Sequence, residues 1–282
     1  MPEILKGTEV AKALRAELEV EAQTLKARGV QPCGCLIRVG ERADDIQYEN
    51  GAAATFEKLG IRVEKRSFAS DVSQDELIFA IDKINADPLI HGVLIFQPLP
   101  NHLDARAIRN RLLPCKDVDG MTDLSTIGVY RNEPIGYAPC TAQACIELLD
   151  HYKIDVAGKN AVVIGRSNIV GKPLSLLLLH RNATVTLCHS KTRNLREVCK
   201  AADILFAAIG RARMIDSDYV SSGQTVIDVG INVLKDGTVC GDVNFDSVAP
   251  IVARLTPVPR GVGSITTTVL AKNILSAAGR TL

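Results

Sequence analysis

The sequence predicts an α/β fold with two domains and a cleft between them. Short apolar segments typical of buried parallel strands alternate along the chain with segments of helical periodicity. This alternation stops at the Pro- and Gly-marked stretch 134–141 and then starts again. A chain of 282 residues is long enough for two such domains. Because ligands of open α/β sheets bind beyond the carboxyl ends of the strands, we expect the functional site in the cleft.

In the first half of the chain, strands and helices alternate and each has a recognisable boundary. Gly29 and Gly60 follow two helical patterns, and Ser73 with Glu76 forms a capping box before a third. The rigid PLP at 98–100 ends the last apolar run. These signals predict helices at 8–28, 44–59 and after Ser73, and strands at 35–39, 61–68 and 90–96.

The second half begins with a connecting helix at 141–152 and repeats the same alternation. Four strands are predicted at 160–164, 183–188, 203–208 and 224–229, with helical segments between the first three. The segment 238–243 is predicted to add an edge strand, and residues 265–279 are predicted to form a final helix. Repeated strand–helix units of this kind imply a mostly parallel sheet with helices on both faces.

Composition narrows the function classes. A formal net charge of +1 argues against a nucleic-acid-binding protein. No apolar run reaches the roughly 18 residues of a membrane span, and the first residues lack a basic start followed by an apolar core. The eight cysteines lack metal-site spacing, since Cys33 and Cys35 have no second close pair. We therefore expect a cytoplasmic protein with structural thiols and no metal.

The segment from Ala161 to Pro173, AVVIGRSNIVGKP, is the strongest candidate for a ligand site. Its apolar run stops at Gly165, and Pro173 suits the first turn of the helix that follows. A strand, a Gly-containing turn and a helix N-terminus favour phosphate through backbone N–H groups and the helix dipole. The turn lacks the full GxGxxG pattern, so this motif alone is weak evidence for a nucleotide.

The residues after the second strand of this half favour NADP over NAD. An acid at that point would accept a hydrogen bond from the 2′-hydroxyl of NAD. Here the strand is followed by His189, Ser190, Lys191, Thr192 and Arg193, and no acid is present. Arg166 in the phosphate turn can reach toward the same point. The alternative is that these are ordinary solvated loop residues.

Seven short motifs occur in order along nearly the whole chain. They are KDVDG at 116–120, PCTA at 139–142, GRSNIVGKP at 165–173, CHSKT at 188–192, VIDVGIN at 226–232, GDV at 241–243 and TPVP at 256–259. Together they resemble the methylenetetrahydrofolate dehydrogenase/cyclohydrolase family. The resemblance implies a Rossmann-type NADP domain at 141–264. It also implies an α/β catalytic, folate-binding domain formed by 1–140 with 265–282, and a cytoplasmic homodimer.

The resemblance also implies an activity and its residues. The activity is NADP-dependent oxidation of 5,10-methylenetetrahydrofolate, followed by hydrolysis of the methenyl product to 10-formyltetrahydrofolate. The cofactor would contact Gly165, Arg166, Ser167, Ser190 and Ile231, with Gly230–Asn232 near the nicotinamide.

In the other domain, Tyr48 and Asp119 would contact the substrate, Tyr48 by stacking and Asp119 by holding the pterin. The alternative for both is a purely structural role, as a half-buried helix tyrosine and a turn carboxylate.

Two positions depart from the family pattern in the catalytic half. The family carries a lysine four residues after the tyrosine, where this chain has Ala52, and a glutamine where it has Phe96. Lys58 lies nearly three turns beyond Tyr48. Gln97 is expected on the opposite face of an extended strand, the alternative being a shift at the strand end that brings it inward. Ala52 has no proton to transfer, so we expect the cyclohydrolase step to be weak or lost.

Other changes keep two further functions open. Met121 follows the KDVDG turn in place of an aromatic residue, and Arg260 replaces a glycine of the closing loop. A long cation there would clash with the family ligand or recognise an anionic one. The alternatives are therefore an NADP-dependent oxidoreductase acting on another cyclic amine or imine, and a non-catalytic paralogue that binds NADP or folate.

Overall fold

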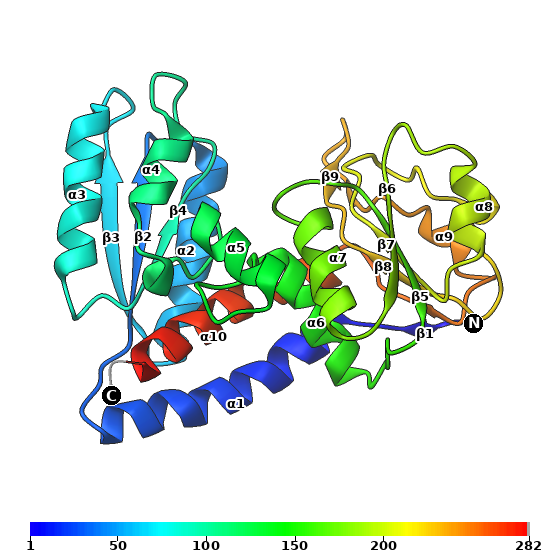
Figure 1. The fold of residues 1–282 in the computed structure, drawn as a ribbon, viewed down its shortest axis with the longest axis horizontal. Helices are drawn as coiled ribbons and strands as arrows, with labels where there is room; N and C mark the ends of the chain where they lie inside the picture. The colour runs from blue at the N-terminus through cyan, green and yellow to red at the C-terminus, as the bar shows by residue number, and fades with distance from the viewer. Residues whose placement is uncertain (281–282) are drawn as a thin grey trace. The chain divides into compact units, whose positions relative to one another are not determined.

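The computed structural model describes residues 1–280, which form two compact units (Figure 1). The first comprises residues 1–12 with 141–266 and is called here the six-stranded unit. The second comprises residues 13–140 with those from 267 onward and is called the three-stranded unit. Both units contain helices and parallel strands, which confirms the predicted α/β class.

The three-stranded unit is built on a parallel sheet in the order β3-β2-β4 (Figure 1). Its strands are β2 (Cys33–Val39), β3 (Arg62–Phe68) and β4 (Gly92–Ile95). Its helical elements are α2 (Ala43–Lys58), α3 (Gln74–Ala86), α4 (Ala105–Arg111), η1 (Pro114–Lys116) and α5 (Asp123–Arg131), together with most of α1 (Gly7–Ala27) and α10 (Thr266–Gly279).

The core of this unit has two sides because alternate residues of β2 face opposite ways. Cys35 belongs to a buried cluster with Leu77 of α3. Gly34 faces the other side, where an added Cβ would lie 2.8 Å from Cδ1 of Ile274 in α10 and 3.4 Å from Cε2 of Phe56 in α2. Helices therefore cover both faces of the sheet, as predicted. The predicted cap is also present, since the Ser73 hydroxyl accepts from Glu76 N at 3.2 Å.

The six-stranded unit has a parallel sheet in the order β1-β11-β8-β7-β5-β6. The strands of this sheet are β1 (Glu3–Ile4), β5 (Asn160–Ile164), β6 (Thr184–Cys188), β7 (Ile204–Ala207), β8 (Thr225–Asp228) and β11 (Arg254–Leu255). Its helical elements are α6 (Cys140–His151), α7 (Gly171–His180), α8 (Leu195–Lys200), η2 (Ser217–Tyr219), α9 (Phe245–Val248) and η3 (Val262–Ser264).

The order in which strands are added to the sheet reverses at β5. From β5 it passes through α7 to β6 at one edge of the sheet, and from β6 it returns through α8 to β7 on the other side of β5. This reversal makes a topological switch point at the carboxyl ends of β5 and β7. Ligands of open α/β sheets bind at such a point.

Two features of this unit differ from the sequence prediction. The expected edge strand at 238–243 is wrong, because β10 (Val239–Cys240) pairs antiparallel with β9 (Asn232–Val233) in a separate small sheet. The sheet is instead extended by β11 and β1, which were not predicted. Strands of two residues leave no alternation for a sequence pattern to detect.

The functional domain limits, 1–140 with 265–282 and 141–264, stay a prediction, because compactness alone assigns no ligand to a unit.

Among the helices of residues 1–280, none combines the length and the apolar character that a transmembrane span requires.

Phe56 provides a test of the packing in the three-stranded unit. Its side chain is fully buried, whereas that of Phe79 on α3 is 59% exposed. We expect Phe56→Ala to lower the free energy of unfolding by about 3–5 kcal/mol through lost burial and cavity formation. Phe79→Ala, the matched control, should lower it by about 1 kcal/mol or less, since it loses only an exposed contact with Lys83. Urea unfolding followed by circular dichroism measures both, and equal losses would contradict this account of the core.

Candidate functional site

The turn after β5 is formed by close backbone packing that only glycine allows. Gly165 has a φ of +121°, and a Cβ on it would lie 2.0 Å from the carbonyl oxygen of Ala208. A Cβ on Gly171, the first residue of α7, would lie 1.8 Å from the carbonyl oxygen of Gly165. The end of β5, the start of α7 and the segment after β7 are therefore in direct backbone contact.

Ser167 caps the start of α7. Its hydroxyl accepts hydrogen bonds from the backbone N–H of Val170 at 3.1 Å and of Gly171 at 3.4 Å. Its carbonyl oxygen accepts from Lys172 N at 3.1 Å. The predicted strand, turn and helix N-terminus are thus present, and this end of the helix attracts negative charge.

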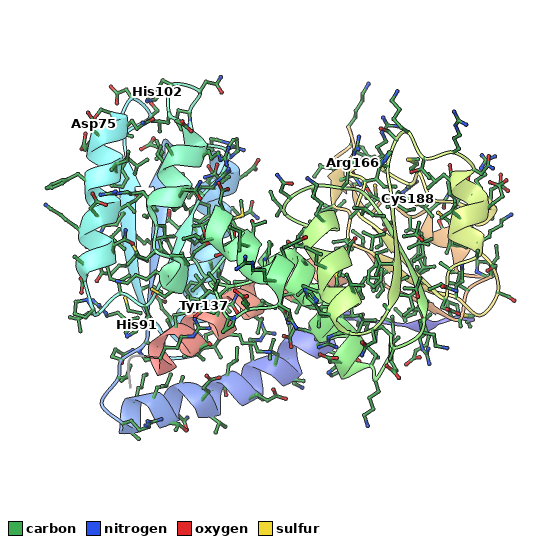
Figure 2. All side chains as sticks on the ribbon, viewed as in Figure 1. Asp75, His91, His102, Tyr137, Arg166 and Cys188 are labelled. Atoms are coloured by element: carbon green, nitrogen blue, oxygen red, sulfur yellow. The ribbon has the colours of Figure 1, made fainter. Side chains whose placement is uncertain are left out.

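A pocket of about 310 Å³ opens at the switch point. Figure 2 labels Arg166, which lies in the turn after β5, and Cys188, the last residue of β6. The pocket is lined by Ile164, Gly165, Arg166, Ser167, His189, Ser190, Leu195, Ala208, Ile209, Arg211 and Met214. This set contains two guanidinium groups, an imidazole and two hydroxyls but no Asp or Glu. Such a donor set suits an anionic ligand.

Four of the five predicted cofactor residues line this pocket, and Ile231 does not. Ile231 follows β8, is 62% exposed, and its Cδ1 would lie 2.9 Å from a Cβ added to Gly263. It therefore lies against the closing loop 256–264. In the same loop Arg260 has a φ of +77°, a conformation that favours glycine, and its carbonyl oxygen accepts from Gly7 N at 2.9 Å.

The turn after β6 is held by its own hydrogen bonds. His189 N donates to the Thr192 hydroxyl at 2.8 Å, and Lys191 N donates to Nδ1 of His189 at 3.1 Å. His189 is thus a turn-forming residue whose ring accepts a hydrogen bond from a backbone N–H. This turn places Ser190 on the wall of the pocket.

Two buried carboxylates, whose role was not recognised in the sequence, organise the loops around the pocket. Asp242 accepts from the backbone N–H of Ile209, Gly210 and Arg211 at 2.5–2.9 Å. Asp228, at the end of β8, accepts from the backbone N–H of Gly230, Asp242 and Val243 at 2.9–3.0 Å. Burial raises the pKa of Asp228 to about 7.

The glycines beside these acids leave room for them. A Cβ on Gly230 would lie 2.2 Å from Cγ of Asp242, and one on Gly241 would lie 1.8 Å from Oδ2 of Asp228. The available signal was an acid within two residues of a glycine, Asp228 with Gly230 in VIDVGIN and Asp242 with Gly241 in GDV. That pattern is typical of a buried carboxylate packed against the backbone.

In the three-stranded unit, Tyr48 lies beside Phe96. Their ring centroids are 5.8 Å apart with an interplanar angle of 80°, an edge-to-face contact. Tyr48 is 43% exposed, whereas Phe96 is 7% exposed. Ala52, one turn after Tyr48 on α2, is 1% exposed. The side chains around Tyr48 at these two positions are therefore apolar.

Lys58 and Gln97 are the two polar residues that the sequence offered in place of the lysine and the glutamine of the family pattern. Lys58 is exposed at the end of α2, about 15 Å along the helix axis from Tyr48. Gln97 follows β4 and is partly buried, and its Nε2 is buried without a hydrogen-bond partner among the described residues.

The KDVDG turn contains two acids with different environments. Asp117 is buried and accepts from Met121 N at 3.0 Å, Thr122 N at 2.8 Å and the Ser125 hydroxyl at 2.6 Å, so it holds the start of α5. Asp119 instead accepts hydrogen bonds from the thiol and the backbone N–H of Cys140. Burial raises the pKa of Asp119 to about 7; the thiol of Cys140, by hydrogen bonding, works against this shift, and the charge of Asp117 adds to it.

Asp119 therefore changes charge near neutral pH, which is typical of a carboxyl group at a functional site. It lines a small cavity formed by β4, the end of α4 and the turn before α5, with Val93, Ile95, Arg109, Leu112, Asp117, Met121 and Thr122. Tyr48 is not among these lining residues. Within residues 1–280, no group of three or more His, Cys, Asp or Glu residues could hold a metal ion.

Comparison with known proteins decides the family. Residues 5–119 match the tetrahydrofolate dehydrogenase/cyclohydrolase catalytic domain, and residues 139–282 match the NAD(P)-binding domain of the same family. The chain belongs to the tetrahydrofolate dehydrogenase/cyclohydrolase family. The resemblance found in the sequence motifs is thereby confirmed.

Individual relatives agree with this assignment over the full length. The chain is 50% identical over 279 residues to bifunctional protein FolD of Carboxydothermus hydrogenoformans, covering 98% of this chain and 97% of the relative. The crystal structure of bifunctional FolD from Campylobacter jejuni superposes with a TM-score of 0.97 at 35% identity, covering 100% of both chains. FolD of Trypanosoma brucei, solved with NADP cofactor and an inhibitor, has a TM-score of 0.92 at 32% identity over 100% and 99% of the chains.

The family assignment gives the two units their context. The NAD(P)-binding domain of the family spans the pocket at the switch point, including Gly165, Arg166, Ser167 and Ser190. The catalytic domain of the family spans Tyr48, Ala52, Phe96 and Asp119. The roles of the individual residues in binding and catalysis stay predictions.

Gly165 tests whether the backbone approach shapes the dinucleotide pocket of this family member. We expect Gly165→Ala to weaken NADP binding at least tenfold, because its Cβ would overlap the Ala208 carbonyl. Gly158→Ala is the matched control, since Gly158 also has a positive φ, +69°, but no atom within 4 Å of the added Cβ. The control should cost about 1–2 kcal/mol of stability and leave NADP affinity unchanged. Titration calorimetry and thermal unfolding measure both effects. Unchanged NADP affinity in Gly165→Ala would contradict the prediction.

Proposed function

We propose that this protein oxidises 5,10-methylenetetrahydrofolate to 5,10-methenyltetrahydrofolate with NADP, as part of one-carbon metabolism. The observation that carries the proposal is the pocket at the switch point, which has two arginines and two serines but no carboxylate. That donor set fits a dinucleotide with an additional phosphate. When bound, NADP supplies the hydride acceptor.

On the cofactor side, the residues of the chain bind and orient. Gly165 allows the backbone to approach the phosphates, Arg166 and Ser190 supply charge and hydrogen-bond donors, and Ser167 fixes the helix start. Ile231, from the end of β8, would contact the nicotinamide end, as the family resemblance implies. By holding the cofactor in a fixed position, these groups would promote hydride transfer through proximity and orientation.

On the substrate side, we propose that Tyr48 stacks on the flat part of the folate and that Asp119 holds the pterin. Tyr48 is 43% exposed and its ring makes an edge-to-face contact with Phe96, so part of its surface is accessible to a ligand. An ionised Asp119 accepts hydrogen bonds from ring N–H groups, whereas the protonated form is a poorer acceptor. The pKa of about 7 makes this contact dependent on pH.

We propose further that the hydrolysis of the methenyl product is weak or lost. Hydrolysis needs an activated water and proton transfer, and Ala52 and Phe96 provide neither at the two positions where the family has lysine and glutamine. Both positions are buried and the Phe96 ring packs against Tyr48. We also propose that the protein is a cytoplasmic homodimer, as the family resemblance implies. Light scattering of the purified protein tests whether it is a dimer.

The two activities can be measured separately on the purified protein. We expect the protein to oxidise 5,10-methylenetetrahydrofolate with NADP, and the absorbance of the NADPH formed measures this reaction. We expect methenyl hydrolysis to be roughly 10²–10⁴-fold slower than in the Campylobacter jejuni relative assayed in parallel, because a general acid–base group is missing. Hydrolysis without protein gives the background. Equal hydrolysis by the two proteins would show that Ala52 does not remove the step. If the protein binds folate but does not oxidise it, a binding paralogue is favoured. If it does not bind folate, another amine or imine substrate is favoured.

The pH dependence of oxidation tests Asp119. We expect kcat/KM to rise as the pH increases through about 7, because the ionised carboxylate binds the substrate better than the acid. Asp119→Asn should remove this step and lower kcat/KM about 10–100-fold, the effect of losing a charged hydrogen bond. Asp123→Asn is the control, since Asp123 is exposed and paired with Arg106; it should keep the step. A pH step that persists in Asp119→Asn would assign it to another group.

A further inference from the structure

A second arginine, Arg211, lines the pocket beside Arg166; the function proposed above counts it in the charge of the pocket but assigns it no contact with the cofactor. It comes four residues after the end of β7, and its backbone N–H donates to Oδ1 of Asp242 at 2.8 Å. Its side chain is exposed and forms part of the pocket wall. The sequence motifs did not single out this residue.

Neither guanidinium group forms an ion pair with another of the described residues. Among the ion pairs of residues 1–280, none involves Arg166 or Arg211. No carboxylate lines the pocket that they share. Two unpaired cations in one small pocket repel each other, and a dianion between them removes that repulsion.

The backbone that carries Arg211 is fixed before any ligand binds. Asp242 is fully buried and accepts from three consecutive N–H groups, those of Ile209, Gly210 and Arg211, and from Nδ2 of Asn232 at 2.9 Å. Asp242 is itself held, through its own N–H, by Asp228. A cation on an anchored backbone loses less conformational entropy on binding than one on a mobile loop.

The chemistry of the pocket separates two kinds of phosphate. A pyrophosphate is suited to the backbone N–H groups and the N-terminus of α7. A monoester phosphate carries close to two negative charges and accepts paired hydrogen bonds from the planar fork of a guanidinium. Two arginines in addition to the helix start therefore exceed what a pyrophosphate alone requires.

We propose that Arg211 acts together with Arg166 as a two-arginine clamp for the 2′-phosphate of NADP and so determines the preference for NADP over NAD. This inference rests on the proposed function, since it assumes that a dinucleotide occupies this pocket. It adds a specificity-determining residue from the segment after β7 to those of the turns after β5 and β6.

The test compares NADP and NAD binding to the full-length protein by titration calorimetry, without turnover. Arg211→Gln should weaken NADP binding about tenfold or more, the effect of losing one charged hydrogen-bonding group, and change NAD binding less than twofold. Arg213→Gln is the matched control, because it removes the same charge two residues away from a side chain that does not line the pocket. It should leave both affinities unchanged.

A double variant tests whether the two arginines act on one phosphate. Arg166→Gln and Arg211→Gln combined should bind NADP and NAD with about equal affinity, and each single variant should keep part of the preference. Thermal unfolding checks that all variants are folded. Increasing salt should weaken NADP binding to the wild type more than to Arg211→Gln, since fewer charges are then paired.

Each other outcome has one meaning. If Arg211→Gln weakens NADP and NAD equally, Arg211 contacts a part that both share, and the inference is wrong. The inference is also wrong if Arg166→Gln alone abolishes the preference. If the wild type binds neither dinucleotide, the proposed function itself fails. If it binds both and Arg211→Gln leaves the preference intact, only the inference about Arg211 fails.

Discussion

The carboxyl end of the six-stranded sheet depends on two buried acids that bind backbone N–H groups. Asp242 fixes the segment after β7, and Asp228 fixes Asp242 and the loop after β8. Buried carboxylates are costly unless their oxygens accept hydrogen bonds, so the chain must fold these loops around them. Gly230 and Gly241 allow the close contact. The shape of the dinucleotide pocket follows from this network as much as from the glycines of the phosphate turn.

The two units differ in the polarity of the side chains at their candidate sites. The pocket of the six-stranded unit is rich in donors without an acid. Around Tyr48, in contrast, Ala52 and Phe96 present only apolar groups. Asp119, whose pKa is raised by burial, lies in the turn after η1 and lines a separate small cavity. Hydride transfer relies mainly on positioning, whereas hydrolysis relies on proton transfer. This difference is the basis of the proposal that oxidation takes place and that hydrolysis is weak or lost.

Long, regular segments could be predicted from the sequence because their periodicity is strong. The phosphate turn was also predictable, since a buried strand, a glycine and a proline-marked helix start are local signals, and the structure places Gly165, Arg166, Ser167 and Ser190 on one pocket. Strands β1 and β11 could not be predicted, because each has two residues and is defined only by pairing across the chain.

The role of Asp242 was missed for a similar physical reason. Its partners, the N–H groups of residues 209–211, lie more than thirty residues earlier in the chain. Arg211 was missed because it belongs to no motif, and only the fold brings it to the wall that carries Arg166. The edge-to-face contact of Phe96 with Tyr48 likewise depends on how β4 and α2 pack.

The distribution of thiols has a practical consequence. Of the eight cysteines, Cys115 is exposed and the others are buried, and burial raises the pKa of Cys145 to about 12, which keeps that thiol protonated and unreactive. Cys115 lies four residues before Asp119 in the chain, in η1. A maleimide dye would thus attach at a single position, four residues from the acid proposed to hold the pterin. In a chain without tryptophan, such a label offers an optical reporter of folate docking.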